Sequence, residues 1–143
     1  MISLLDVNVL LSLAWSNHPH HHLAHGWFAR EATLGWATCL LTQIGFLRLS
    51  LNPKIVGVAL DCQAVMALLA GLTAHPNHRF VDLAPTITAA PFDELVPAIA
   101  GYQQITDAAL MHLARFHGMK LVTLDQAASA LCPWSGNLEV IVP

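Results

Sequence analysis

The sequence contains little charge of either sign. Its 143 residues include six Lys and Arg against nine Asp and Glu, so that charged residues make up 10% and the net charge at pH 7 is −3. A globular domain ordinarily has about 25% charged residues. A chain with so few basic side chains is a poor candidate for holding nucleic acid by bulk positive charge. Any nucleic acid bound here needs bridging cations, a few local arginines or a second subunit.

Long uninterrupted apolar runs are also missing. Residues 7–29 carry no formal charge but include five histidines, and threonines, glycines and Gln43 interrupt residues 32–47. A membrane-spanning helix needs about twenty predominantly apolar residues. The beginning of the chain carries Asp6 and no basic residue, which is unlike a signal peptide. We therefore expect no membrane segment and a cytoplasmic protein.

Cysteine is scarce, and its spacing argues against cross-links. The three cysteines, Cys39, Cys62 and Cys132, are far apart and form no CxxC pair. Their odd number and wide spacing predict reduced core thiols rather than a disulfide framework or a zinc site. The sequence also lacks the GxGxxG, P-loop and GxSxG patterns, so nothing in it indicates those phosphate-binding loops or that serine nucleophile.

Apolar residues, in contrast, are abundant at 55% of the chain. With no internal repeat or linker, this composition predicts one domain that spans residues 1–143. The apolar excess over what one core needs indicates an oligomer or a protein partner.

Short apolar runs alternate along the chain with segments of helical periodicity. We predict strands at 2–5, 36–38, 79–83, 121–124 and 139–142, and helices at 7–15, 20–31, 40–51, 61–73, 107–117 and 126–131, with a weaker helical stretch at 91–102. Strands that are apolar on both faces and separated by helices are typical of a parallel sheet covered on both sides. The predicted fold is therefore a three-layer αβα domain with a short parallel sheet of about four to five strands.

Three aspartates and one amide are predicted to converge at one edge of this sheet. Asp6 and Asp125 each follow a strand directly, so both lie at the edge where parallel strands end. Asp107 begins a helix of about eleven residues, which descends roughly 16 Å. This length nearly matches the rise of the strand that follows, so Asp107 also starts at this edge. Gln43 lies in the first turn of the helix that follows the strand at 36–38.

Clustered carboxylates repel one another, and a bound divalent cation removes that penalty. Carboxylate oxygens are hard ligands, which favour Mg²⁺ or Mn²⁺ over zinc. Such a site can convert a bound water into a nucleophile and stabilise charge on a scissile phosphate. Each acid has an ordinary alternative role, because Asp6 and Asp125 are also placed to cap helices and Asp107 to stabilise a first turn.

Four ordered blocks of sequence resemble the PIN-domain family, and within it the VapC-type toxins of bacterial toxin–antitoxin pairs. The blocks are LLDVNVL at 4–10, TQIGFLR at 42–48, ITDAAL at 105–110 and LVTLD at 121–125. The resemblance covers nearly the whole chain in order and spacing. It implies a PIN-like fold and a metal-dependent ribonuclease, usually dimeric, that an antitoxin inhibits by inserting a segment near the active site.

The resemblance also implies roles for individual residues. Asp6, Asp107 and Asp125 would be the ligands of Mg²⁺ or Mn²⁺, and Asn8 would orient Asp6 or bind through water. The position of Gln43 is commonly a glutamate in this family. An amide offers a carbonyl oxygen but no charge, which would weaken the hold on metal.

Two further residues lie beside these motifs. Thr106 is predicted to cap the helix that begins with Asp107, and so to support that acid. Arg48, on the same helix as Gln43, is a weak candidate for contacting the RNA phosphates. The histidine-rich stretch at 18–25 is interpreted as a solvated helix start rather than a zinc site.

The leading hypothesis is an endoribonuclease toxin that acts on RNA, assembles with a cognate antitoxin, forms a homodimer and meets DNA only through that antitoxin. The alternative is a catalytically silent module, weakened by Gln43, that acts by assembly with the antitoxin. A phosphotransfer domain is a third option. It is disfavoured because Asn8 stands where a second acid is usual, and because Lys120 precedes its strand instead of ending it.

Overall fold

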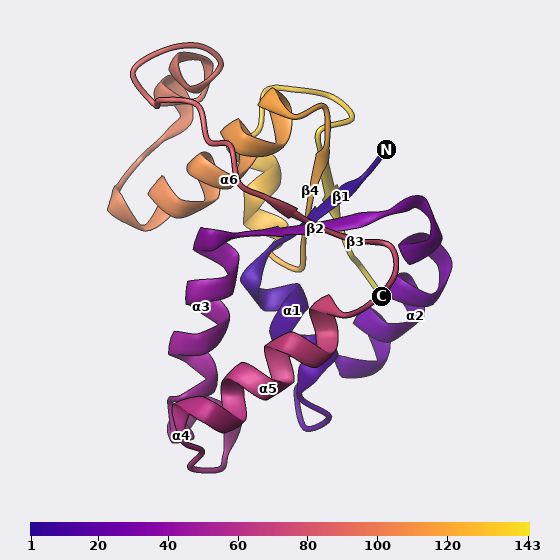
Figure 1. Ribbon diagram of the computed structural model, residues 1–143. Helices are drawn as coiled ribbons and strands as arrows, with labels where there is room; N and C mark the ends of the chain where they lie inside the picture. Colours follow the sequence, from indigo (N-terminus) through magenta and orange to yellow (C-terminus); the bar gives the residue numbers. More distant parts are fainter.

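A central sheet of five parallel strands organises the computed structural model, which describes residues 1–143. The strands lie in the order β3-β2-β1-β4-β5, so β1 is in the middle (Figure 1). Their bounds are β1 Ser3–Leu5, β2 Trp36–Cys39, β3 His78–Val81, β4 Lys120–Thr123 and β5 Leu138–Val140. The predicted three-layer fold and the number of strands are confirmed.

Helices cover both faces of the sheet. One layer holds α1, α2, α3 and α5, and α6 lies on the opposite face (Figure 1). The α-helices are α1 Val7–Ala14, α2 His21–Glu31, α3 Leu40–Ser50, α4 Pro53–Val56, α5 Cys62–Thr73 and α6 Ile105–Phe116. Short 3₁₀ turns are η1 Ala32–Leu34, η2 Phe92–Glu94, η3 Val96–Ala98, η4 Tyr102–Gln104 and η5 Gln126–Ala130. No helix is both long enough and apolar enough to cross a bilayer.

Neighbouring residues of the central strands β1 and β4 contribute to two separate cores. Leu4 and Leu121 pack on the α6 side, whereas Leu5 and Val122 pack on the α1 side. Successive side chains of a strand point to opposite faces, so a strand buried on both faces must be apolar throughout. This explains why the strands appear in the sequence as continuous apolar runs.

The strand order reverses direction between β1 and β4. The chain moves outward from β1 to β2 and β3, then returns so that β4 pairs with the other side of β1. Leu4 is opposite Leu121 and Leu5 is opposite Val122 in this register. In an open parallel sheet, such a switch point leaves a crevice beyond the carboxyl ends of the strands. Asp6 and Asp125 follow the two strands that form it.

The apolar stripe of α3 faces outward. Leu40, Ile44 and Leu51 have exposed fractions of 61%, 41% and 37%, whereas the buried residues of the helix include Thr42 and Phe46. Leu68 of α5 is also exposed, with a fraction of 37%. Periodicity therefore predicts the helices but not which face is covered.

The segment between β3 and α6 departs from its predicted form. The weak helix expected at 91–102 is instead a series of 3₁₀ turns; Pro97 lies inside η3, and Gly101 directly precedes η4. His112 of α6 and His117 directly after this helix hold the start of the segment, since their ring nitrogens lie 3.3 Å and 2.6 Å from the carbonyl oxygens of Pro85 and Leu83. His112 is buried, with an exposed fraction of 2%.

The cysteines are unpaired, but only one is a core residue. Cys39 is buried, Cys132 is half-buried and Cys62 is exposed at the start of α5. The prediction of core thiols is therefore wrong for Cys62, because the first residue of an α-helix on the outer layer need not face the core.

Close contact between α1 and α3 depends on a glycine. A Cβ atom on Gly45 would lie 2.6 Å from Cγ2 of Val7, whose branched side chain has little freedom to move. Val7 follows Asp6, and Gly45 is two residues beyond Gln43. The missing side chain therefore allows α3 to approach the part of α1 that carries an acid of the crevice.

We expect Gly45→Ala to lower the free energy of unfolding by about 1–3 kcal/mol, because the added methyl group overpacks this contact. Gly71→Ala is the matched control, since nothing lies within 4 Å of a Cβ atom at that exposed position of α5. The control should gain roughly 0.5–1 kcal/mol. Urea denaturation measures both, and a Gly45→Ala variant as stable as the parent would refute the contact.

Candidate active site

Asp6 is the most buried acid of the crevice. It lies between β1 and α1 with an exposed fraction of 9%. Its Oδ1 accepts a hydrogen bond from the backbone N–H of Val7 at 2.7 Å, and its Oδ2 accepts one from the hydroxyl of Thr123 at 2.7 Å. Burial raises the pKa of Asp6 above its ordinary value; the two hydrogen bonds partly lower it, and the negative charge of Asp125 raises it again.

Thr123 joins three segments of the site through one hydroxyl group. While it donates to Asp6, the same oxygen accepts hydrogen bonds from Nδ2 of Asn8 at 3.0 Å and from the backbone N–H of Asp125 at 3.1 Å. A hydroxyl has one proton and two lone pairs, so Thr123 uses its full capacity here. Asn8 also accepts a hydrogen bond from the backbone N–H of Leu124 at 3.1 Å. Asn8 therefore acts on Asp6 through Thr123.

Asp107 and Asp125 complete the acidic group. Asp125 is exposed and caps η5, with Oδ1 accepting a hydrogen bond from the backbone N–H of Ala127 at 2.9 Å. Asp107 is half-buried in the first turn of α6. Burial raises the pKa of Asp107 to about 6, and the negative charges of Asp6 and Asp125 contribute to this rise. The structure thus brings these three aspartates within electrostatic reach of one another.

The donor set suits a hard divalent cation that is held partly through water. All three acids offer carboxylate oxygens, and their mutual repulsion is the penalty that a cation removes. No three His, Cys, Asp or Glu side chains are close enough to hold an ion directly between them. Mg²⁺ usually keeps several of its waters in proteins, so a site of one or two direct carboxylates and bridging water fits these residues.

Gln43 lies in α3, directly after the neighbouring strand β2. It is half-buried, and its Nε2 donates a hydrogen bond to the hydroxyl of Thr38 at 3.0 Å. Its carbonyl oxygen accepts no hydrogen bond from the protein. Gln43 therefore offers a free oxygen at the end of the strand beside Asp6.

Thr106, one of the predicted site residues, is placed differently. Thr106 does not cap α6, because the helix begins at Ile105 after a 3₁₀ turn and Gln104 occupies the cap position. The hydroxyl that supports an acid belongs instead to Thr123. Arg48 is exposed in the last turn of α3, about 7.5 Å beyond Gln43 along the helix axis. It forms no ion pair with the acids, and its contact with RNA phosphates stays a prediction.

Thr123 is the functional residue that the sequence analysis missed. The available signal was its position two residues before Asp125 at the end of a buried strand, because a polar residue there faces the crevice. Threonine is common in strands, so a single threonine within an apolar run gave no sign that Thr123 hydrogen bonds to Asp6.

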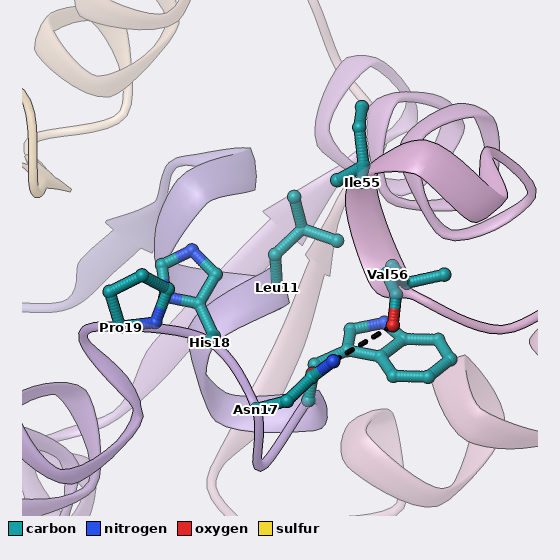
Figure 2. Close-up of a pocket in the computed structure, with 7 residues that line it drawn as sticks. Leu11, Asn17, His18, Pro19, Ile55 and Val56 are labelled. Atoms are coloured by element: carbon teal, nitrogen blue, oxygen red, sulfur yellow. Dashed lines mark hydrogen bonds between the residues drawn. The ribbon is translucent and has the colours of Figure 1, made fainter.

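The opposite end of α1 carries a small apolar pocket, which Figure 2 shows. Its lining comprises Leu11, Trp15, Asn17, His18, Pro19, Ile55 and Val56. The nearby His21 and His25 contact the carbonyl oxygens of Ser12 and Leu13 at 2.7 Å and 2.9 Å. The histidine-rich stretch thus attaches α2 to the C-terminal end of α1, far from the acids at its N-terminus.

The parallel sheet and the acidic crevice at its carboxyl edge together define a class of protein. A family model described as PIN domain matches residues 3–132, which include every strand but the last and all three aspartates.

Relatives from Mycobacterium tuberculosis identify the family within this class. Ribonuclease VapC38 is 46% identical over 130 residues, which cover 91% of this chain and 89% of the relative. Ribonuclease VapC39 is 38% identical over 142 residues, which cover 99% of this chain and all of the relative. The chain therefore belongs to the VapC family of PIN-domain proteins.

Solved structures of more distant proteins share the fold. A VapBC2 complex of Rickettsia felis, bound to a DNA fragment from its promoter, contains a chain that matches with a TM-score of 0.67 and 16% identity, over 98% of both chains. VapC20 of Mycobacterium tuberculosis, described as a sarcin–ricin loop cleaving toxin, matches with a TM-score of 0.65 and 16% identity, over 90% of this chain and 93% of that one. At this identity, the likeness concerns the fold alone.

The acidic crevice has a measurable consequence in the metal-free protein. The pKa of Asp107 is about 6 in the folded state and 3.8 ordinarily, so the folded state binds this proton more tightly than the unfolded chain. This contribution favours folding at low pH and is lost as the pH rises through 6. We expect Asp107→Asn in EDTA to raise the melting temperature at pH 7.5, with a smaller gain at pH 5.

Asp93→Asn is the matched control, because it removes the same charge from an exposed turn. It should show no gain that depends on pH in this way. Thermal unfolding by circular dichroism measures both variants, and an Asp107→Asn gain that is the same at both pH values would contradict the predicted repulsion.

Proposed function

We propose that this chain is a metal-dependent endoribonuclease and the toxin of a type II toxin–antitoxin pair. The observation that carries the proposal is the group formed by Asp6, Asp107 and Asp125, three acids from distant segments at one strand edge. Burial and the charge of Asp125 raise the pKa of Asp6, and burial and the charges of Asp6 and Asp125 raise the pKa of Asp107. The names of its VapC relatives, which are ribonucleases, support the same activity.

In this mechanism Asp6, Asp107 and Asp125 would hold Mg²⁺ or Mn²⁺, partly through water. When bound, the cation supplies an activated water and stabilises charge on the scissile RNA phosphate. Thr123 and Asn8 keep Asp6 oriented by hydrogen bonds, and Gln43 offers a neutral oxygen. The acids of the crevice need the cation for another reason, because uncompensated carboxylates repel a polyanionic substrate.

Substrate binding in this proposal depends little on basic residues. The chain carries only six Lys and Arg residues and a net charge of −3. The cation therefore supplies much of the contact with phosphate, and groove shape with a few polar side chains selects the RNA. Because the proposed substrate is RNA, we propose that the reaction takes place in the cytoplasm.

A cognate antitoxin is the proposed protein partner. The related VapBC2 complex was solved bound to a fragment of promoter DNA. With its low basic content, this chain is poorly suited to bind DNA itself, so we assign DNA contact to the antitoxin.

A homodimer is the second assembly that we propose. Leu40 and Ile44 of α3 and Leu51, the residue directly after it, form an exposed stripe, and α3 lies at the outside of the molecule (Figure 1). Their spacing of four and seven residues is that of one helical face, and such a stripe packs well on its own copy around a two-fold axis.

We expect Asp6→Asn and Asp107→Asn to reduce cleavage of a random-sequence RNA library by at least roughly 10²-fold, because each removes charge that stabilises the reaction. Cleavage with Mg²⁺ or Mn²⁺ is followed on denaturing gels, and circular dichroism verifies the fold. Asp93→Asn is the control and should remain active.

Full activity of both variants would remove this mechanism. The silent module is the alternative that Gln43 favours, since an amide replaces charge at that position. Calorimetry separates the two hypotheses: binding of Mn²⁺ at millimolar concentration or below supports the enzyme, whereas no binding together with no cleavage supports the module.

The stripe on α3 gives a separate prediction. We expect Ile44→Glu to convert a dimer into a monomer, because a charge in the centre of an apolar interface is left without a partner. Leu34→Glu is the control, since Leu34 is 59% exposed at the other end of β2. Sedimentation velocity measures the assembly state. A parent protein that is monomeric at all concentrations, or an Ile44→Glu dimer, would refute this interface.

A further inference from the structure

Thr38 lies fully buried between Gln43 and a histidine from the next strand. Its hydroxyl oxygen is 3.0 Å from Nε2 of Gln43 and 2.8 Å from Nε2 of His78. Strand β2 carries Thr38 and strand β3 carries His78, and the two strands pair in parallel with Thr38 opposite Phe80. The three side chains therefore form a continuous hydrogen-bonded series from the edge strand to Gln43.

The direction of each hydrogen bond follows from the state of His78. Burial, together with the neighbouring His75, lowers the pKa of His78, so its ring is neutral at pH 7. The hydroxyl of Thr38 is fully buried, and Nε2 of Gln43 and Nε2 of His78 are its only hydrogen-bond partners. Since the amide nitrogen of Gln43 can only donate, the proton of this hydroxyl has Nε2 of His78 as its only acceptor, and the proton of the neutral ring is on Nδ1.

A neutral imidazole with its proton on Nδ1 presents a bare lone pair on Nε2. The hydroxyl of Thr38 must then donate to His78, and its oxygen is free to accept from Gln43. The amide nitrogen of Gln43 faces Thr38, which leaves the carbonyl oxygen of Gln43 for other partners. Each member of the series fixes the orientation of the next.

We propose that Thr38 and His78 are positioning residues that hold the amide of Gln43 with its carbonyl oxygen available to the cation or its waters. This inference rests on the proposed function, because it assigns Gln43 to the same site. A glutamate at position 43 has no N–H to donate and would compete with His78 for the proton of Thr38. The series is therefore matched to glutamine, and the amide is a working part of this site.

The first test reads the tautomer of His78 directly. Long-range ¹H–¹⁵N NMR spectra of the labelled wild-type protein at pH 7.5 distinguish a proton on Nδ1 from one on Nε2. We expect the Nδ1–H form. The Nε2–H form would reverse every hydrogen bond of the series and would overturn the proposal. This measurement needs neither metal nor RNA.

The second test is a double-mutant cycle read by calorimetric titration with Mn²⁺ alone. Thr38→Val and Gln43→Ala should each weaken binding by roughly tenfold, the scale for losing a residue that orients a ligand. Thr38→Ser keeps the hydroxyl and should keep most of the affinity. In the Gln43→Ala background, Thr38→Val should have no further effect.

Equal losses from Thr38→Val in both backgrounds would show a general structural role and overturn the proposal. Unchanged affinity in Gln43→Ala would do the same while leaving the nuclease mechanism intact, provided that Asp6→Asn abolishes binding. If the wild-type protein binds no Mn²⁺, both the proposed function and this inference fail. Should Thr38→Val not fold, the NMR measurement on the wild-type protein still decides the direction of the series.

Discussion

Parallel pairing of β1 with β4 is the constraint on which the acidic crevice depends. The first strand and the fourth strand in the chain become neighbours, and the residues that follow them end at the same edge. Because neighbouring strands lie about 5 Å apart, Asp6 and Asp125 must share an environment whatever the details of the loops. The hydrogen bond from Thr123 to Asp6 then joins the two strand ends through side chains. Helix α6, which packs against β4, adds Asp107 from the same direction.

Asp6 and Asp125 each combine a structural role in helix capping with the proposed role in binding a cation. Asp6 and Asp125 both cap the helical segments that follow them, and both contribute to the repulsion that a cation would relieve. A capping bond stabilises a carboxylate, whereas burial and like charge destabilise it. At Asp6 burial dominates, which leaves a carboxylate in need of a partner. Helix capping by Asp6 and Asp125 is therefore compatible with their proposed role in binding a cation.

Much of this arrangement could be predicted from the sequence, and the failures have identifiable physical causes. Strands, helices and the meeting of the three aspartates follow from apolar periodicity and from the geometry of parallel sheets. The exposed stripe of α3 could not be predicted, because periodicity defines a face but not what covers it. Thr106 was assigned the role of a cap because α6 follows directly on the 3₁₀ turn η4 and begins two residues before the predicted start, which leaves no pattern in the sequence. Thr123 was overlooked because its hydrogen bonds reach residues more than a hundred positions away.

The separation of 117 residues between Asp6 and Thr123 has a consequence for synthesis of the protein. Ribosomes make the chain from its N-terminus, so Asp6 emerges long before the strand that must pair with β1. Until β4 has left the exit tunnel, Asp6 has neither its hydroxyl donor nor the neighbouring acid of the next strand, and a nascent chain contains no assembled crevice. Contacts of such long range also form late in folding, because loop closure must precede them. A fold of this topology therefore delays any activity of the crevice until β4 has been made and has left the ribosome.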